Sequence, residues 1–110
     1  MREPLAAARE VSQALRQRGA QIVVAVTHLD MREDRALAER ADVDVILGGH
    51  EHEPLIAEEG KTLITKAGSD ARYLVQIDLW IGRDGRRTER SGPFTRSAPA
   101  WRPIRTSPQW

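Results

Sequence analysis

Three histidines stand just after two apolar segments, and they are the only histidines among the 110 residues. His28 follows the apolar run at residues 21–26, while His50 and His52 follow the run at residues 43–47 and two glycines. Both runs predict strands, and ligands in an open α/β sheet bind where such strands end. Imidazole is the commonest metal-ligating side chain. The spacing therefore predicts a site for a divalent cation.

The pattern His50-Glu51-His52 taken alone is more typical of two exposed loop histidines than of a metal site. In an extended segment, however, residues two apart point to the same side. Gly48 and Gly49 allow a tight turn just before them. Together with His28 after another strand, this arrangement favours metal ligation by all three histidines.

Carboxylates are less clearly placed for this chemistry. Glu51 and Glu53 flank the histidines, but alternation along the chain turns them to the other side, which indicates solvated charges. Asp30 is predicted to cap the helix that also carries Asp34, and Asp70 lies in a loop with no motif around it. A hydrolytic metal centre usually also needs carboxylate ligands, and the sequence does not supply them at matching places.

Two helices and up to five strands are predicted to position the histidines. Apolar residues at helical spacing predict a helix over residues 4–18, and the capping box at residues 30–33 opens a helix to about Arg40. Strands are predicted at residues 21–26, 43–47, 62–65 and 73–81, and the hairpin signal Asp84-Gly85 introduces a fifth at residues 87–94.

This order predicts an α/β fold with a mixed sheet and flanking helices. The strands at residues 21–26 and 43–47 are expected to be buried, parallel neighbours, with His28 and His50 at the same edge of the sheet. The later strands look antiparallel. Because two helices cannot cover both faces of such a sheet, the chain is expected to dimerise or to belong to something larger.

Composition limits the function classes. The chain is 40% hydrophobic, has a net charge of +1 and has no cysteine, so it has no disulfide framework. No apolar stretch is long enough for a membrane span. No signal peptide is recognisable, which predicts a cytoplasmic protein if Met1 is the true start. Seven arginines after residue 82 give a basic end, and residues 98–110 are interpreted as a solvated tail after a domain at 1–97. A phosphate-binding arm is the rarer reading, and a nucleic-acid partner is not indicated.

These residues resemble a known family. Thr27-His28-Leu29, Asp34 and the segment at residues 41–52 are similar to the calcineurin-like metallophosphoesterases, and within them to the 5′-nucleotidase type. Residues 66–79 resemble the strand after that family's metal loop, so the resemblance covers about residues 5–95. It implies one half of a two-sheet sandwich with a centre of two zinc, manganese or iron ions. It also implies that His28 and His50 bind one metal and His52 the other, and that a metal-bound hydroxide attacks a phosphate ester.

The chain lacks several metal-binding motifs that are typical of this family. It contains no asparagine and no Asp-x-His, so the family's bridging aspartate, asparagine ligand and leaving-group histidine have no counterpart. The resemblance then implies the C-terminal half of a catalytic domain, inactive alone and binding at most one ion. Its partner would be the missing N-terminal half, or a second copy in a homodimer. The alternative is a stand-alone metal-binding or oligomerisation module, and neither a catalytic nor a substrate-binding residue is assigned.

Overall fold

A four-stranded mixed sheet with two helices forms the body of the protein. The computed structural model describes residues 3–82, 87–91 and 95–96. In chain order the elements are α1 (Pro4–Gln17), β1 (Val24–Val26), α2 (Met31–Arg40), β2 (Val45–Gly48), β3 (Pro54–Glu59), β4 (Thr62–Ala67), β5 (Tyr73–Leu74), β6 (Ile77–Ile81), β7 (Arg87–Ser91) and β8 (Thr95–Arg96).

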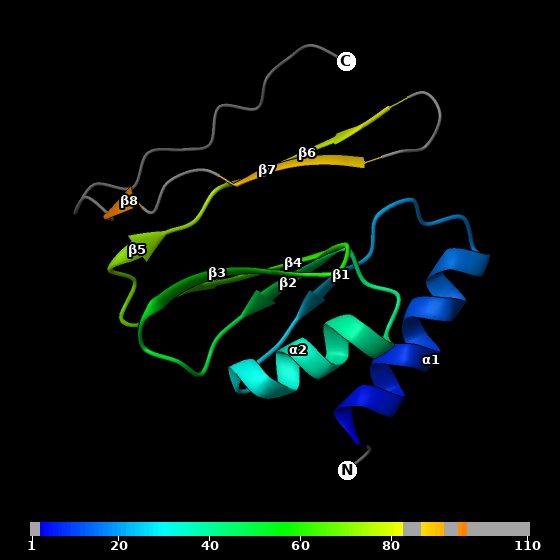
Figure 1. Ribbon diagram of the computed structural model, residues 1–110, viewed down its shortest axis with the longest axis horizontal. Helices are drawn as coiled ribbons and strands as arrows, with labels where there is room; N and C mark the ends of the chain where they lie inside the picture. The colour runs from blue at the N-terminus through cyan, green and yellow to red at the C-terminus, as the bar shows by residue number, and fades with distance from the viewer. Residues whose placement is uncertain (1–2, 83–86, 92–94, 97–110) are drawn as a thin grey trace.

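The strand order in the main sheet is β1-β2-β4-β3. Strands β1, β2 and β4 are parallel, and β3 runs antiparallel to β4. Both helices lie on one side of this sheet, and the β6–β7 hairpin lies on the other (Figure 1). The predicted α/β class, with a mixed sheet and flanking helices, is confirmed.

The two helices begin and end at the positions that the sequence predicts. Asp30 accepts a hydrogen bond from the Glu33 backbone N–H at 2.8 Å, and Glu33 accepts one from the Asp30 N–H at 3.1 Å, which is the predicted capping box. At α1 the side chain of Glu3 caps the first turn. Gly19 follows the helix with a φ of +97°, a conformation that glycine adopts without strain.

The hydrophobic core lies between the helices and the sheet. Ile46 of β2 and Ile64 of β4 are fully buried at its centre. The other buried members of this cluster are Val23, Leu37, Ala38, Ala41 and Val43. Burial of a side chain as large as isoleucine contributes about 1.5–3 kcal/mol, so this layer is what holds β1, β2 and β4 against α2.

The strand before His28 is shorter and more exposed than the sequence predicts. The prediction was a buried strand at residues 21–26, whereas β1 covers only Val24–Val26. Val24 is 45% exposed and Val26 is 81% exposed. Among the described strands, β1 pairs only with β2 and so forms an edge of the sheet. The valines of β1 therefore favour a strand conformation, but the strand is not buried on both faces.

Two further predictions about strands were wrong. The antiparallel strand β3 was missed, and it forms a hairpin with β4 around Gly60. The predicted single strand at residues 73–81 is split, because β5 pairs with β8 while β6 pairs with β7. The turn at Asp84-Gly85, the end of the fifth strand at Phe94 and the tail at residues 98–110 lie outside the described residues.

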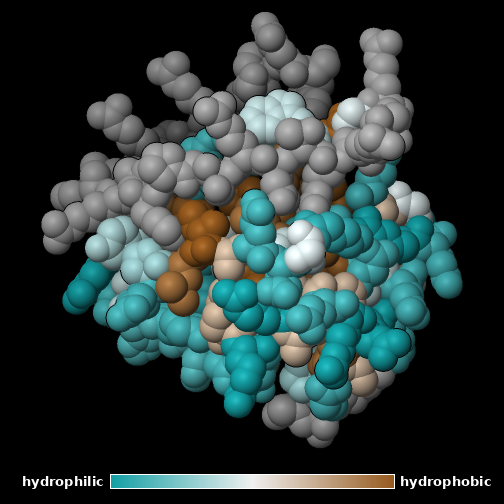
Figure 2. Space-filling view, in the orientation of Figure 1, coloured by the Kyte–Doolittle hydropathy of each residue, from teal (hydrophilic) through white to brown (hydrophobic). Residues whose placement is uncertain are grey.

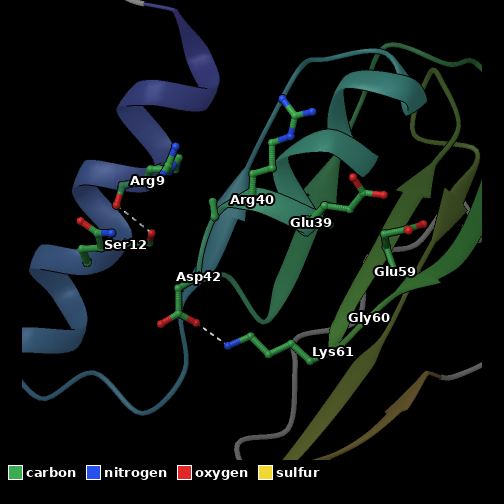
Figure 3. Close-up of a pocket in the computed structure, with 11 residues that line it drawn as sticks. Arg9, Ser12, Glu39, Arg40, Asp42, Glu59, Gly60 and Lys61 are labelled. Atoms are coloured by element: carbon green, nitrogen blue, oxygen red, sulfur yellow. Dashed lines mark hydrogen bonds and ion pairs between the residues drawn. The ribbon is translucent and has the colours of Figure 1, made fainter.

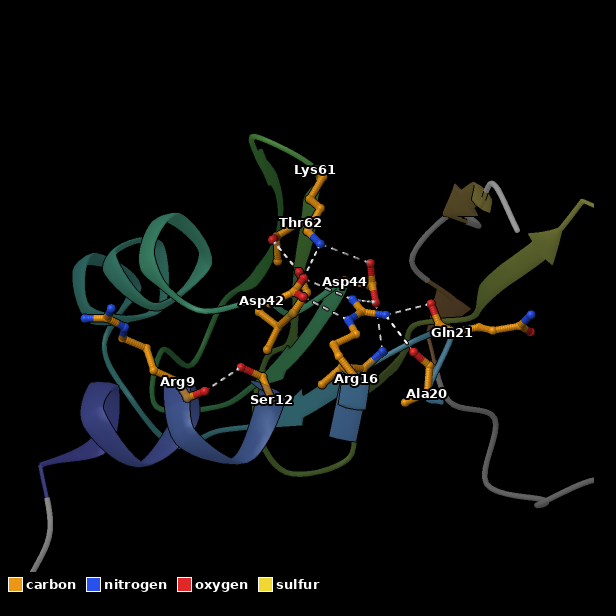
Figure 4. A network of polar contacts seen from close by, with 11 residues as sticks. Arg9, Ser12, Arg16, Ala20, Gln21, Asp42, Asp44, Lys61 and Thr62 are labelled. Atoms are coloured by element: carbon orange, nitrogen blue, oxygen red, sulfur yellow. Dashed lines mark hydrogen bonds and ion pairs between the residues drawn. The ribbon is translucent and has the colours of Figure 1, made fainter. Parts of the chain in front are cut away.

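An ion-pair network fixes α1 against the ends of the strands that lie away from the histidines (Figure 4). Arg16 donates hydrogen bonds to Asp42 at 3.1 Å and to Asp44, and also to the carbonyl of Gln21 at 2.7 Å. Lys61 donates a further hydrogen bond to Asp42. The hydrogen bonds from Lys61 and Arg16 hold the pKa of Asp42 below its ordinary value.

The surface is mixed in character. On the face in Figure 2 the lower part is mainly hydrophilic, and the clearest group of hydrophobic side chains lies left of centre. Within the described part of the chain, no helix is long and apolar enough to cross a membrane.

Candidate metal centre

His28 and His50 lie next to each other just beyond the ends of β1 and β2. The parallel register pairs Val26 with Leu47, so the two loops leave the sheet side by side. The centroids of the two imidazole rings are 5.6 Å apart, and the ring planes are nearly perpendicular at 86°. Both side chains are exposed. The prediction that these two histidines share one edge of the sheet is confirmed.

The backbone around His50 is shaped for this approach. His50 has a φ of +75°, a left-handed conformation that costs a non-glycine residue about 1–2 kcal/mol. A methyl group at Gly49 would lie 3.3 Å from Nδ1 of His28, which is closer than ordinary van der Waals contact. Glycine at this position therefore lets the loop carrying His50 pack directly against His28.

The separation of the two rings fits ligation of a single ion. Two imidazoles on one tetrahedral zinc, with Zn–N bonds of about 2.0–2.1 Å, place their ring centroids roughly 5 Å apart. His52 is exposed, and its backbone carbonyl packs near Gly68. Within the residues that the structure describes, no three His, Cys, Asp or Glu side chains are gathered closely enough to hold a metal ion. Metal ligation by His28, His50 and His52 therefore stays a prediction.

A buried lysine lies beneath the two histidine loops. Lys66 is the last but one residue of β4, and its side chain is completely buried. Its ammonium group donates hydrogen bonds to the carbonyl of Leu29, at 2.8 Å, and to Glu51. It also lies 2.9 Å from Oδ2 of the fully buried Asp34.

These contacts shift the pKa values of Lys66 and Glu51. Burial by itself lowers the pKa of Lys66, but Glu51 and Asp34 outweigh it and the pKa is raised. The hydrogen bond from Lys66 lowers the pKa of Glu51 to about 2. Two carboxylates and one ammonium give the cluster a formal charge of −1. A net negative charge below the two imidazoles favours a cation at this edge.

The interpretation of Glu51 as a solvated charge was wrong. Besides the contact with Lys66, Glu51 accepts a hydrogen bond from the backbone N–H of Met31 at 2.6 Å. The interpretation of Asp30 as a cap is confirmed. Glu53 is exposed, as predicted, and Asp70 lies exposed in the loop after β4.

Sequence reasoning gave Lys66 no role, although a signal was present. The strand Thr62-Leu63-Ile64-Thr65-Lys66 reads as buried, and a lysine in a buried strand needs an anionic partner. Asp34 of α2 and Glu51, which directly follows His50, are those partners. The signal could have predicted a buried ion pair but not its location under the histidines.

Two clefts on the surface are alternative candidate sites. A cleft of about 600 Å³ lies at the opposite end of the sheet, around Asp42, Gly60 and Lys61 (Figure 3). Its lining mixes acidic and basic side chains, and Lys61 is already paired with Asp42. A smaller cleft of about 310 Å³ includes His28, together with apolar residues of α1 and β1. The histidine pair and the cluster around Lys66 therefore lie at the end of the sheet away from the larger cleft.

Comparisons with known proteins find similarity to a solved structure. No family model matches the sequence, and no curated protein matches it. The chain is similar to a solved structure of the sulfate thiohydrolase SoxB from Thermus thermophilus in complex with glycerol, with a sequence identity of 34% and a TM-score of 0.62. The match covers 77% of this chain and 17% of the SoxB chain.

Proposed function

We propose that this chain is part of a metal-dependent phosphoesterase of the 5′-nucleotidase family and that it supplies histidine ligands to the metal centre. SoxB is a metallophosphoesterase of that family, and the similarity at 34% identity supports the superfamily and a hydrolase-like fold. The chain spans about a sixth of the SoxB chain. The observation that carries the proposal is the pair formed by His28 and His50.

His28 and His50 would hold one divalent ion, and His52 is proposed as a further ligand from the same loop. In phosphoesterases of this kind a bound ion lowers the pKa of a water and polarises the phosphate. The residues of this chain hold the two imidazoles at a fitting separation and place a net negative cluster beneath them. Zinc is the expected ion, since it accepts three histidines and a water.

We infer that the chain alone is inactive on phosphate esters. The sequence contains no asparagine and no Asp-x-His, so the bridging aspartate and the asparagine ligand of the family have no counterpart. Two or three neutral imidazoles also leave most of the charge of the ion unbalanced. The proposed role is therefore to complete a metal centre together with ligands from another segment.

Metal titration with matched histidine variants tests this proposal. Calorimetric titration of the 110-residue chain with zinc should show one weak site at pH 7.5, and His28→Ala and His50→Ala should each abolish it. His52→Ala should weaken it, which separates the proposed third ligand from the pair. Equal binding by wild type and both alanine variants of the pair would contradict the metal proposal.

An activity assay tests the proposed incompleteness separately. An aryl phosphate with added zinc or manganese should show no turnover above that of His50→Ala. Turnover near the roughly 10 s⁻¹ median of ordinary enzymes, lost in His50→Ala, would show instead that the chain is a complete enzyme.

A second proposed role is association through the exposed side of β1. Val24, Val26 and Leu47 are apolar and exposed, and among the described strands the outer edge of β1 has no neighbour. Such an edge is a template for pairing with another strand. We propose that the remaining part of a phosphoesterase domain covers it, and that the isolated chain pairs with a second copy.

A further inference from the structure

We infer that Lys66 is a positioning residue that holds the His28 loop and the His50 loop together from below. This inference rests on the proposed metal ligation and goes beyond it, because it assigns the geometry of the histidine pair to a buried lysine on a different strand. Lys66 belongs to β4, whereas the histidines follow β1 and β2. Its side chain reaches both loops at positions directly adjacent to a histidine.

On the side of His28, the cluster holds both neighbours of the histidine. The Leu29 carbonyl accepts a hydrogen bond from Lys66 at 2.8 Å. Thr27 donates its hydroxyl to Asp34 at 2.7 Å, and Asp34 is itself paired with Lys66. The residues on either side of His28 are thus tied to one buried ion pair, Thr27 through its hydroxyl and Leu29 through its carbonyl.

On the side of His50, the contact runs through the next residue along the chain. Glu51 accepts from Lys66 through one carboxylate oxygen and from the Met31 N–H through the other. The backbone N–H of Glu51 donates to the Gly49 carbonyl at 3.0 Å, which closes the turn in which His50 has a positive φ. Glu51 therefore anchors the strained turn to Lys66 and to the start of α2.

A role in stability alone does not account for this arrangement. A buried ion pair is weak evidence for stability, because apolar residues of similar volume often serve as well. Here the partners of one ammonium group are residues beside both histidines, together with Asp34. Groups that orient metal ligands in this way typically change metal affinity by about 10–100-fold when they are mutated.

The first test compares two carboxylates of the same loop. Glu51→Gln keeps an oxygen for the Met31 N–H but removes the charge that pairs with Lys66, and Glu53→Gln removes an equal charge from an exposed position. Glu51→Gln should lower zinc affinity by about 10-fold or more. In the metal-free protein it should also lose the nuclear Overhauser contact between the rings of His28 and His50. Glu53→Gln should keep both.

The second test separates positioning from folding. Lys66→Met leaves Asp34 buried without its ion pair, so Asp34→Asn is added to remove that charge. The double variant should fold with a stability close to that of wild type and still lose the ring contact. If the double variant does not fold, the zinc affinity and the ring contact of Glu51→Gln alone decide whether Lys66 positions the histidines.

The outcomes distinguish this inference from the proposed function. If wild type binds no zinc, the proposed function fails and the ring contact in the metal-free protein still decides the role of Lys66. If Glu51→Gln and the folded double variant keep the ring contact and bind zinc like Glu53→Gln, Lys66 does not position the histidines.

Discussion

Replacing Gly48 with alanine should destabilise the fold through contact with the buried ion pair. An added methyl group would lie 2.9 Å from Asp34 Oδ2 and 3.0 Å from Cε of Lys66. Optimal contacts between non-bonded heavy atoms lie at about 3.5–4.0 Å, so both are strongly repulsive. The side chains of Asp34 and Lys66 are completely buried and cannot move out into solvent. Gly48 does not have a positive φ, so the backbone itself adds no strain.

The expected loss follows from two opposing effects. Overpacking of a closely packed interior costs about 1–3 kcal/mol, and two rigid, charged neighbours favour the upper part of this range. Replacing glycine with alanine also restricts the unfolded chain, which stabilises by about 0.4–1 kcal/mol. The net destabilisation is then about 1–2.5 kcal/mol. At about 4–8 °C per kcal/mol for a domain of this size, the melting temperature should fall by roughly 4–20 °C.

Urea unfolding followed by far-ultraviolet circular dichroism measures this loss. Gly49→Ala is the matched control, because its methyl group would meet the exposed ring of His28 at 3.3 Å, and that ring can turn away into solvent. The control should change the free energy of unfolding by less than about 0.5 kcal/mol while shifting the imidazole resonances of His28. An unfolding free energy of Gly48→Ala within that margin of wild type would refute the close packing of the loop on Lys66 and Asp34.

Two further predictions concern other parts of the sheet. Asp42 has a lowered pKa in the fold, so its ion pairs stabilise fully above the ordinary value of 3.8 and lose this contribution as the pH falls through the lower, folded-state value. Asp42→Asn should therefore melt below wild type at pH 7, and the two melting temperatures should converge in strong acid; a constant difference at all pH values would contradict this. Sedimentation velocity at ~100 μM should show self-association of the chain, and Val26→Lys should reduce it by placing a charge on the open edge of β1. A monomeric wild type at that concentration would count against the association surface.

The sequence predicted those features that depend on local signals. The capping box at Asp30 and Glu33, the C-terminal Gly19 and the parallel strands before the histidines were all recognisable from neighbouring residues. The meeting of His28 and His50 followed from a general rule, because the carboxyl ends of adjacent parallel strands share an edge.

The parts that sequence reasoning missed depend on packing between distant segments. Strand β3 begins with Pro54 and ends with Glu58 and Glu59, a composition that suits an edge strand but reads as a loop. Apolar runs do not reveal whether a strand has a second neighbour, so the exposure of β1 was not predictable. The side to which Glu51 turns depends on a lysine of β4, and no local spacing connects them.

The short length of β1 has a consequence for motion at the histidine edge. With three residues and one described neighbour, β1 is held by few backbone hydrogen bonds, and such segments open locally far more often than a whole domain unfolds. Opening of β1 would carry His28 away from His50. A ligand bound by both imidazoles would therefore fasten the edge strand to β2, and slower amide hydrogen exchange in β1 would report its binding without any measurement of catalysis.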